Sequence, residues 1–164
     1  MKRNLVTVVV VAVLLTVTSC GSKKTTINET ASYVTFDTQC LGIGYDGTQT
    51  LRVWGKGANK AEAIEAAKKK ALNDVIFTGV NAGNSECSRR PLIYEVNAKE
   101  KYSYYFNPFF SKGGEYSRYV VYDDNNRSHY SEAKGADRQS IGIVVTVKCD
   151  ELRQRLIDDN IIKP

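Results

Sequence analysis

Histidine is the side chain best suited to acid–base chemistry near neutral pH, and this chain of 164 residues contains one, His129. It lies between Ser128 and Tyr130 in a polar stretch. A catalytic base needs a nucleophile or substrate proton within hydrogen-bond reach, and no serine–histidine–acid order can be argued around this residue. We interpret His129 as a surface side chain and predict no catalytic residue and no enzymatic activity.

Oxygen ligands cluster at Asp123–Asn126, which contains two aspartates and two asparagines. Such side chains bind Ca²⁺, but the segment lacks the glycine and the distal glutamate of an EF-hand loop. A plain turn is the favoured interpretation. No CxxC pair accompanies the single histidine, so we predict no metal site and no dissociable cofactor.

Cys20 is the residue whose surroundings point most clearly to chemistry. Lys2 and Arg3 precede an apolar run over Leu5–Leu15, and small residues follow up to Cys20. This order is typical of a secretory signal, here residues 1–19. A transmembrane helix is disfavoured because it needs about 20 apolar residues.

The sequence around Cys20 resembles the lipobox of bacterial lipoproteins. The resemblance implies a covalent diacylglycerol and an N-acyl chain on Cys20, which would anchor the protein to a membrane. Gly21, where an inner-membrane lipoprotein of enteric type has Asp, implies the outer membrane. Residues 21–26 lack the acidic cluster that marks surface export in Bacteroidota, so we expect the protein to face the periplasm.

Removing the first 19 residues leaves 145, enough for one domain with a core, and removes two cations and no anion. The net charge then falls from +5 to +3, which does not favour nucleic acid as a partner. The polar residues 20–30 are predicted to be a flexible tether, and residues 31–164 a single domain.

Three cysteines remain after lipidation. Cys40 and Cys87 both lie in loop-like sequence, and we predict a disulfide between them. Cys149 stands where a strand is expected to meet a helix, and a buried free thiol is predicted there.

Apolar alternation predicts strands, the strongest over Ile141–Lys148. The other predicted strands are Tyr33–Phe36, Thr48–Lys56, Pro91–Ala98, Tyr116–Tyr122 and Arg127–Lys134. A helix is predicted from Asn59, its cap, to about Thr78, with Gly79 as its stop. A second helix should have Asp150 as its cap and end at Asn160. The fold class is therefore α+β, with one mainly antiparallel sheet and two helices packed on one face.

An aromatic segment, Tyr102–Phe110, is the candidate interaction site, because six of its nine residues are rings. The six are Tyr102, Tyr104, Tyr105, Phe106, Phe109 and Phe110. Two interpretations carry equal weight: a docking surface for another protein, or rings of which half fill the core. Stacking of a glycan on these rings is a lesser alternative.

The segment Arg52–Gly57, followed by the alanine-rich run Ala61–Leu72, resembles the strand, glycine turn and helix of two envelope families. These are the twenty-kilodalton Helicobacter-type lipoproteins and the N-terminal domain of flagellar assembly protein T. The segment Phe109–Tyr116 is similar to uncharacterised Bacteroidota lipoproteins. So are Val145–Val147, Leu152–Arg153 and Asn160–Ile162 taken together.

These resemblances imply envelope scaffolding, such as a docking component of a secretion system, with the membrane and other envelope proteins as partners. The alternatives are a peptidoglycan- or glycan-binding module and a cell-wall enzyme.

Overall fold

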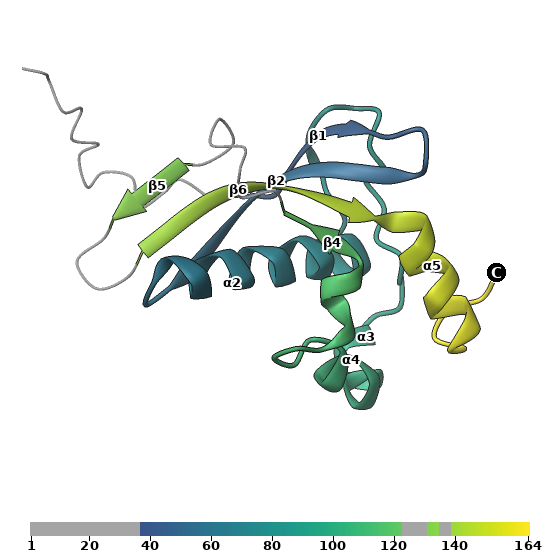
Figure 1. Cartoon of the computed structure of the whole chain (residues 1–164). Coiled ribbons are helices and arrows are strands. Elements are labelled where there is room, and N and C mark those ends of the chain that lie inside the picture. The colour runs from purple at the N-terminus through teal and green to yellow at the C-terminus, as the bar shows by residue number, and fades with distance from the viewer. Residues whose placement is uncertain (1–36, 123–130, 135–138) are drawn as a thin grey trace, which may run out of the picture. The chain divides into compact units, whose positions relative to one another are not determined.

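The computed structural model describes residues 37–122, 131–134 and 139–164 (Figure 1). Its strands form one six-stranded sheet in the order β3-β1-β2-β6-β4, with β5 also paired to β6. Every pairing is antiparallel except the short parallel pair of β1 and β3. The strands are β1 (Gln39–Ile43), β2 (Thr48–Gly57), β3 (Ala82–Gly83), β4 (Val120–Val121), β5 (Ser131–Lys134) and β6 (Gln139–Lys148).

The helices complete an α+β fold, which confirms the predicted class. They are α2 (Lys60–Asn73), the π-helix η2 (Asp74–Thr78), α3 (Ala98–Lys101), α4 (Ser103–Phe109), the 3₁₀-helix η3 (Glu115–Arg118) and α5 (Cys149–Asp158). Helix α2 lies along β2 and β6, and α5 leaves the end of β6 (Figure 1). Leu152 and Leu156 of α5 are fully buried in the same core as the α2 face.

Strands β2 and β6 pair along their whole lengths, and this ladder organises the domain. Leu51 lies opposite Val145, and Val53 lies opposite Ile143. All four side chains are fully buried, because side chains alternate across a strand and these share the face that α2 covers.

Helix α2 can approach the sheet closely because the residues on both facing surfaces have small side chains or none. Its buried residues include Ala63, Ala67 and Ala71, and β2 presents Gly55 to them. A Cβ on Gly55 would lie 2.0 Å from the carbonyl oxygen of Ala63. The helix begins as predicted: the side chain of Asn59 accepts a 3.0 Å hydrogen bond from the backbone N–H of Glu62.

The predicted stops of both helices are confirmed, since Gly79 has φ 80° and Asn160 has φ 57°. The predicted cap of the last helix is wrong. Lys148 occupies the N-cap position, and Asp150 lies within the first turn.

Two predicted strands are also wrong. Pro91–Ala98 forms no strand, because the backbone N–H groups of Leu92 and Ile93 donate to carbonyls of η2, at 3.0 and 2.9 Å. Tyr116–Tyr122 begins inside η3, and only β4 pairs with the sheet.

Within the part of the chain that the structure describes, no helix is both long and apolar enough to cross a membrane. The signal peptide, the tether with Cys20, and the segments Tyr33–Phe36, Asp123–Asn126 and 127–130 with His129 lie outside the described residues.

Candidate binding pocket

The aromatic segment of the sequence folds into α4 and mostly faces inward. Tyr102, Phe106 and Phe109 are between 4% and 8% exposed. Phe106 meets Phe109 edge-to-face with ring centroids 5.9 Å apart, and Phe109 stacks on Tyr119 at the same separation. The contact to Tyr119 packs α4 against the residue that follows η3.

The predicted six-ring docking surface is therefore corrected. Tyr105 and Phe110 are partly buried against the core, and Tyr104 alone among the six is strongly exposed, at 71%. A helix of this length directs rings to several sides, and the side facing η3 and η2 takes most of them. The second interpretation, that half of the rings fill the core, describes the arrangement.

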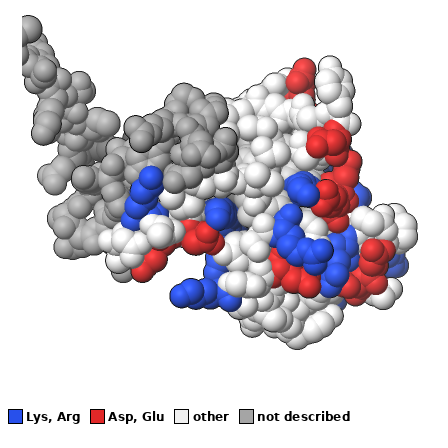
Figure 2. All heavy atoms as spheres, viewed as in Figure 1, with Lys and Arg blue, Asp and Glu red and all other residues white. Residues whose placement is uncertain are grey.

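A polar network joins α4 to α5 outside this cluster. The Tyr105 hydroxyl donates to Asp159 at 2.6 Å, and the Arg155 Nε donates to the same carboxylate at 2.6 Å. Burial and the hydrogen bond to Asp159 raise the pKa of Tyr105, which keeps the phenol neutral. Figure 2 shows positive and negative side chains interspersed on this side of the molecule.

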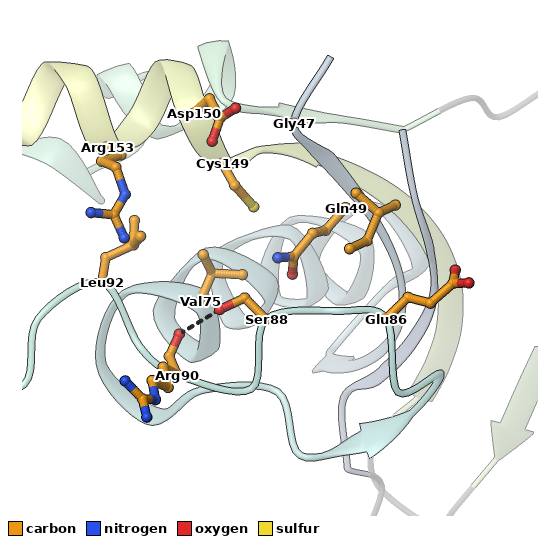
Figure 3. Close-up of a pocket in the computed structure, with 11 residues that line it drawn as sticks. Gly47, Gln49, Val75, Glu86, Ser88, Arg90, Leu92, Cys149, Asp150 and Arg153 are labelled. Carbon is orange, nitrogen blue, oxygen red and sulfur yellow. Dashed lines mark hydrogen bonds between the residues drawn. The ribbon is translucent and has the colours of Figure 1, made fainter. Parts of the chain in front are cut away.

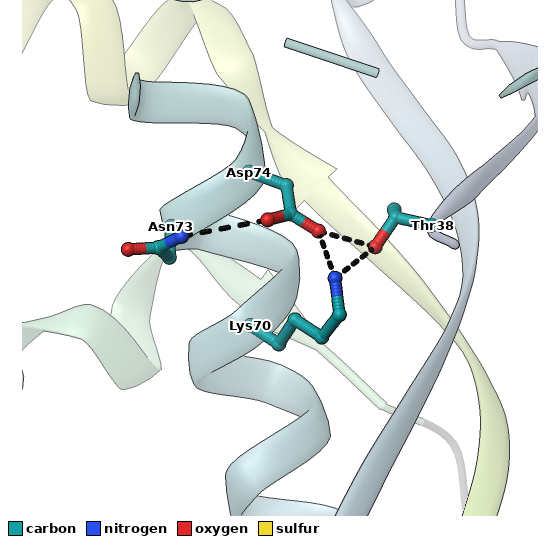
Figure 4. Close-up of polar contacts among 4 residues, drawn as sticks. All are labelled: Thr38, Lys70, Asn73 and Asp74. Atoms are coloured by element: carbon teal, nitrogen blue, oxygen red, sulfur yellow. Dashed lines mark hydrogen bonds and ion pairs between the residues drawn. The ribbon is translucent and has the colours of Figure 1, made fainter. Parts of the chain in front are cut away.

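A second polar cluster fastens the beginning of the described domain (Figure 4). The Thr38 hydroxyl donates to Asp74 at 2.5 Å, and the Lys70 ammonium contacts the same carboxylate oxygen at 2.5 Å. Thr38 and Asp74 are buried. Because each group has a partner within the cluster, its role is to hold the chain before β1 against the junction of α2 and η2.

Cys40 and Cys87 form a disulfide, the pair that their positions in the sequence suggested. Their Cα atoms lie 6.2 Å apart, and the bond ties β1 to the loop that follows β3. Cys149 is free and buried, as predicted. Burial, with the charge of Asp150 adding to it, raises the pKa of its thiol to about 12, so the nucleophilic thiolate is scarce at neutral pH.

The loop after β3 borders a cavity of about 280 Å³ at the end of the sheet where α5 begins (Figure 3). Four parts of the chain that are distant in sequence form its walls: the turn between β1 and β2, η2, the loop of residues 86–92 and the first turn of α5. The volume is close to the lower limit of ordinary small-molecule sites, at about 300 Å³.

Gln49 lines this cavity, and its amide points into it from β2 (Figure 3). It lies on the same face of β2 as Leu51 and Val53, pairs with Val147 across the ladder, and is 7% exposed. Its Oε1 atom accepts no hydrogen bond from the described residues. An unsatisfied buried acceptor lowers the stability of the fold by about 1–3 kcal/mol, so a ligand or water that donates to this atom would be favoured.

Charged side chains surround Gln49 with both signs. Arg90 and Arg153 line the side of the cavity nearest Leu92, while Glu86 lies on the opposite side and Asp150 beside the β1–β2 turn (Figure 3). Within the described chain, neither arginine has an ion-pair partner, and nor does Asp150. The charges sum to zero but are separated across the cavity.

No sequence motif singles out residues 86–92, and the predicted site residues do not include Gln49 although its position carries a signal. In the alternating strand, residues 49, 51 and 53 share a face, so a glutamine there had to be buried with the apolar side chains. Among the described residues, no group of three or more metal-ligating side chains is present. Comparison with family models, curated proteins and solved structures found no match to this chain.

Proposed function

We propose that this chain is a lipid-anchored protein of the bacterial cell envelope, attached to the outer membrane through Cys20 and facing the periplasm. Its domain has a non-catalytic role as a docking component of an envelope assembly, such as a secretion system. The observation that carries the proposal is the Cys40–Cys87 disulfide in a domain that follows a lipobox-like segment. Disulfides persist in oxidising compartments such as the periplasm and are rare in the cytosol.

The side chains that we propose for docking differ from the six-ring cluster suggested by the sequence. Three tyrosines of the described surface are 63% exposed or more: Tyr45, between β1 and β2, Tyr94, in the loop before α3, and Tyr104, on α4. Tyrosine is enriched at protein interfaces because its ring packs while its hydroxyl forms a hydrogen bond. These side chains support a role in partner contact.

The anchor is tested by replacing Cys20 with serine and fractionating cells. We expect the wild-type protein in the outer-membrane fraction, with an intact mass that includes acyl chains, and the Cys20→Ser variant without acyl mass and released from the membrane. A Ser19→Ala variant, which keeps a small residue before the cysteine, is the matched control and should stay anchored. Membrane retention of Cys20→Ser would contradict the proposal.

Docking is tested separately by in-cell crosslinking. A photoreactive phenylalanine analogue placed at Tyr45, Tyr94 or Tyr104 should yield adducts of discrete mass with other envelope proteins. The same analogue at Lys112, an exposed residue of the loop after α4, is the control and should yield less adduct. Equal yields at all four positions, or no adduct at any tyrosine, would contradict a docking role for these side chains.

A binding module for cell-wall material is the second candidate, and the cavity around Gln49 is the observation that favours it. This candidate is compatible with docking because the cavity and Tyr104 involve different residues.

A further inference from the structure

The cavity around Gln49 has three properties that together specify a ligand. Its volume, about 280 Å³, suits a molecule the size of an amino acid. Gln49 lines it, and the Oε1 atom of that side chain is buried and accepts no hydrogen bond from the described residues. Its walls carry positive charge on one side and negative charge on another.

We propose that this cavity binds an α-amino acid group in its zwitterionic form, with a free ammonium and a free carboxylate. The carboxylate would lie towards Arg153, whose planar guanidinium donates two hydrogen bonds to a carboxylate. The ammonium would lie towards Asp150 and donate to Gln49. This arrangement pairs Arg153 and Asp150, two of the lining charges that have no ion-pair partner in the described chain, and gives the buried acceptor a donor.

The surrounding fold is suited to holding such a ligand in place. Gln49 is fixed by the β2–β6 ladder, and Arg153 and Asp150 extend from the first turn and a half of α5. Gly47, with φ 73°, allows the β1–β2 turn to pack against the Asp150 carboxylate, where any Cβ would lie 1.8 Å from Oδ2. The disulfide holds Glu86 and Ser88 at the opposite wall.

Water is the competing occupant, since a polar cavity of this size also admits it. Water would donate to Gln49, but a cavity that holds only water would not bind a zwitterion better than a molecule with one charge. The prediction therefore concerns discrimination among probes that differ in a single charged group.

The test is calorimetric titration of the full chain in detergent with alanine, N-acetylalanine and alaninamide at neutral pH. We expect alanine to bind and each singly blocked analogue to bind at least about tenfold more weakly, the loss typical of one charge-assisted hydrogen bond. No binding of alanine, or equal binding of the three probes, would overturn the proposal.

Variants locate the site. Arg153→Gln and Asp150→Asn should each weaken alanine binding about tenfold, for the same reason. Arg118→Gln, an exposed arginine of η3 outside the cavity, is the matched control and should bind as the wild type does. Gln49→Leu should remove binding, and the two surface variants keep the test decisive if this core change unfolds the domain. Unchanged affinity in both surface variants would overturn the assignment.

A second arm identifies the source of the amino acid group. A cell-wall peptide that ends in diaminopimelate carries the same free ammonium and carboxylate as alanine. Only this arm of the test rests on the proposed envelope location. Tighter binding of that peptide than of alanine assigns the site to cell-wall material. Equal or weaker binding assigns it to free amino acids. Neither result depends on fractionation of the Cys20 variant, so failure of the anchor and failure of the site are distinguishable.

Discussion

At the scale of single residues, β2 contains two departures from a simple apolar face. Gln49 places an amide where the alternation with Leu51 and Val53 favours an apolar side chain, and its Oε1 atom remains without a partner in the described domain. Gly55 places a hydrogen where a side chain would otherwise point at α2. The first departure reduces stability and creates a polar centre in a cavity, whereas the second permits close packing of helix on sheet.

Gly55→Ala should destabilise the domain by about 1–3 kcal/mol, the usual cost of overpacking a core. The added Cβ would meet the backbone at Ala63 and Ala67, at 2.0 and 2.4 Å, and backbone cannot rotate away as a side chain can. Urea unfolding followed by circular dichroism measures the change. Gly42→Ala in β1 is the matched control, because no heavy atom lies within 4 Å of its Cβ position. Equal stabilities of the two variants would contradict the close packing.

The buried thiol makes stability fall at alkaline pH. The pKa of Cys149 is raised from 9.0 to about 12 by burial and by Asp150, and burial with a hydrogen bond to Glu65 raises the pKa of Tyr116 from 10.0 to about 12. Between pH 9 and 12 the unfolded chain therefore loses protons that the folded chain retains. Folding stability should be complete below pH 9 and decline as pH rises, by about 1.4 kcal/mol per pH unit for each proton.

Urea titrations at a series of pH values measure this slope, and Cys149→Ala should flatten it over the lower part of the range. The matching labelling experiment uses iodoacetamide at pH 8, where Cys149 should react slowly in the native protein and quickly in urea. Rapid labelling of the native thiol would show that it is not buried as described.

At the scale of elements, α2, β2 and β6 could be predicted because each carries a long periodic pattern with a clear start and end. Pro91–Ala98 could not, although Leu92, Tyr94 and Val96 alternate as in a strand. The loop hydrogen-bonds to carbonyls of η2, and a π-helix that exposes such acceptors has no signature in local sequence. The cavity was equally hidden, because its walls come from four segments that only the tertiary fold brings together.

Helix α4 has one buried side and one exposed side, and the stability of variants on each side tests this arrangement. Phe109→Ser should destabilise the domain by about 3–5 kcal/mol, because it removes a buried ring that contacts Phe106, Phe110 and Tyr119. Tyr104→Ser, on the exposed side of the same helix, should change stability by less than about 0.5 kcal/mol. Thermal and urea unfolding of both variants provide the comparison. A Phe109→Ser protein as stable as the wild type would contradict the burial of that ring in the core.

At the scale of the whole molecule, a polar cluster and a disulfide both hold the described domain close to where it begins. Thr38 is held by Asp74 and Lys70, and two residues later Cys40 is bonded to Cys87. A domain proposed to hang from a membrane by its N-terminal side benefits from such ties, since force on the tether would otherwise peel β1 from β2. The disulfide also sets the position of the loop that forms one wall of the cavity.

Removing that disulfide should therefore affect both stability and the cavity. The bond closes a loop over a sequence separation of 47 residues, and loss of a native disulfide from a small secreted domain typically costs about 2–5 kcal/mol. A Cys40→Ala/Cys87→Ala protein should unfold at correspondingly lower urea concentration, and reduced wild-type protein should match it. The control is Cys149→Ala. Reductant should lower the urea midpoint of this variant by the same amount as that of the wild type. Peptide mass mapping under non-reducing conditions establishes the pairing directly, and a Cys87–Cys149 bridge would contradict it.

With the loop of residues 86–92 released, Glu86 and Ser88 would no longer be held opposite Gln49, so any ligand affinity of the cavity should fall together with stability.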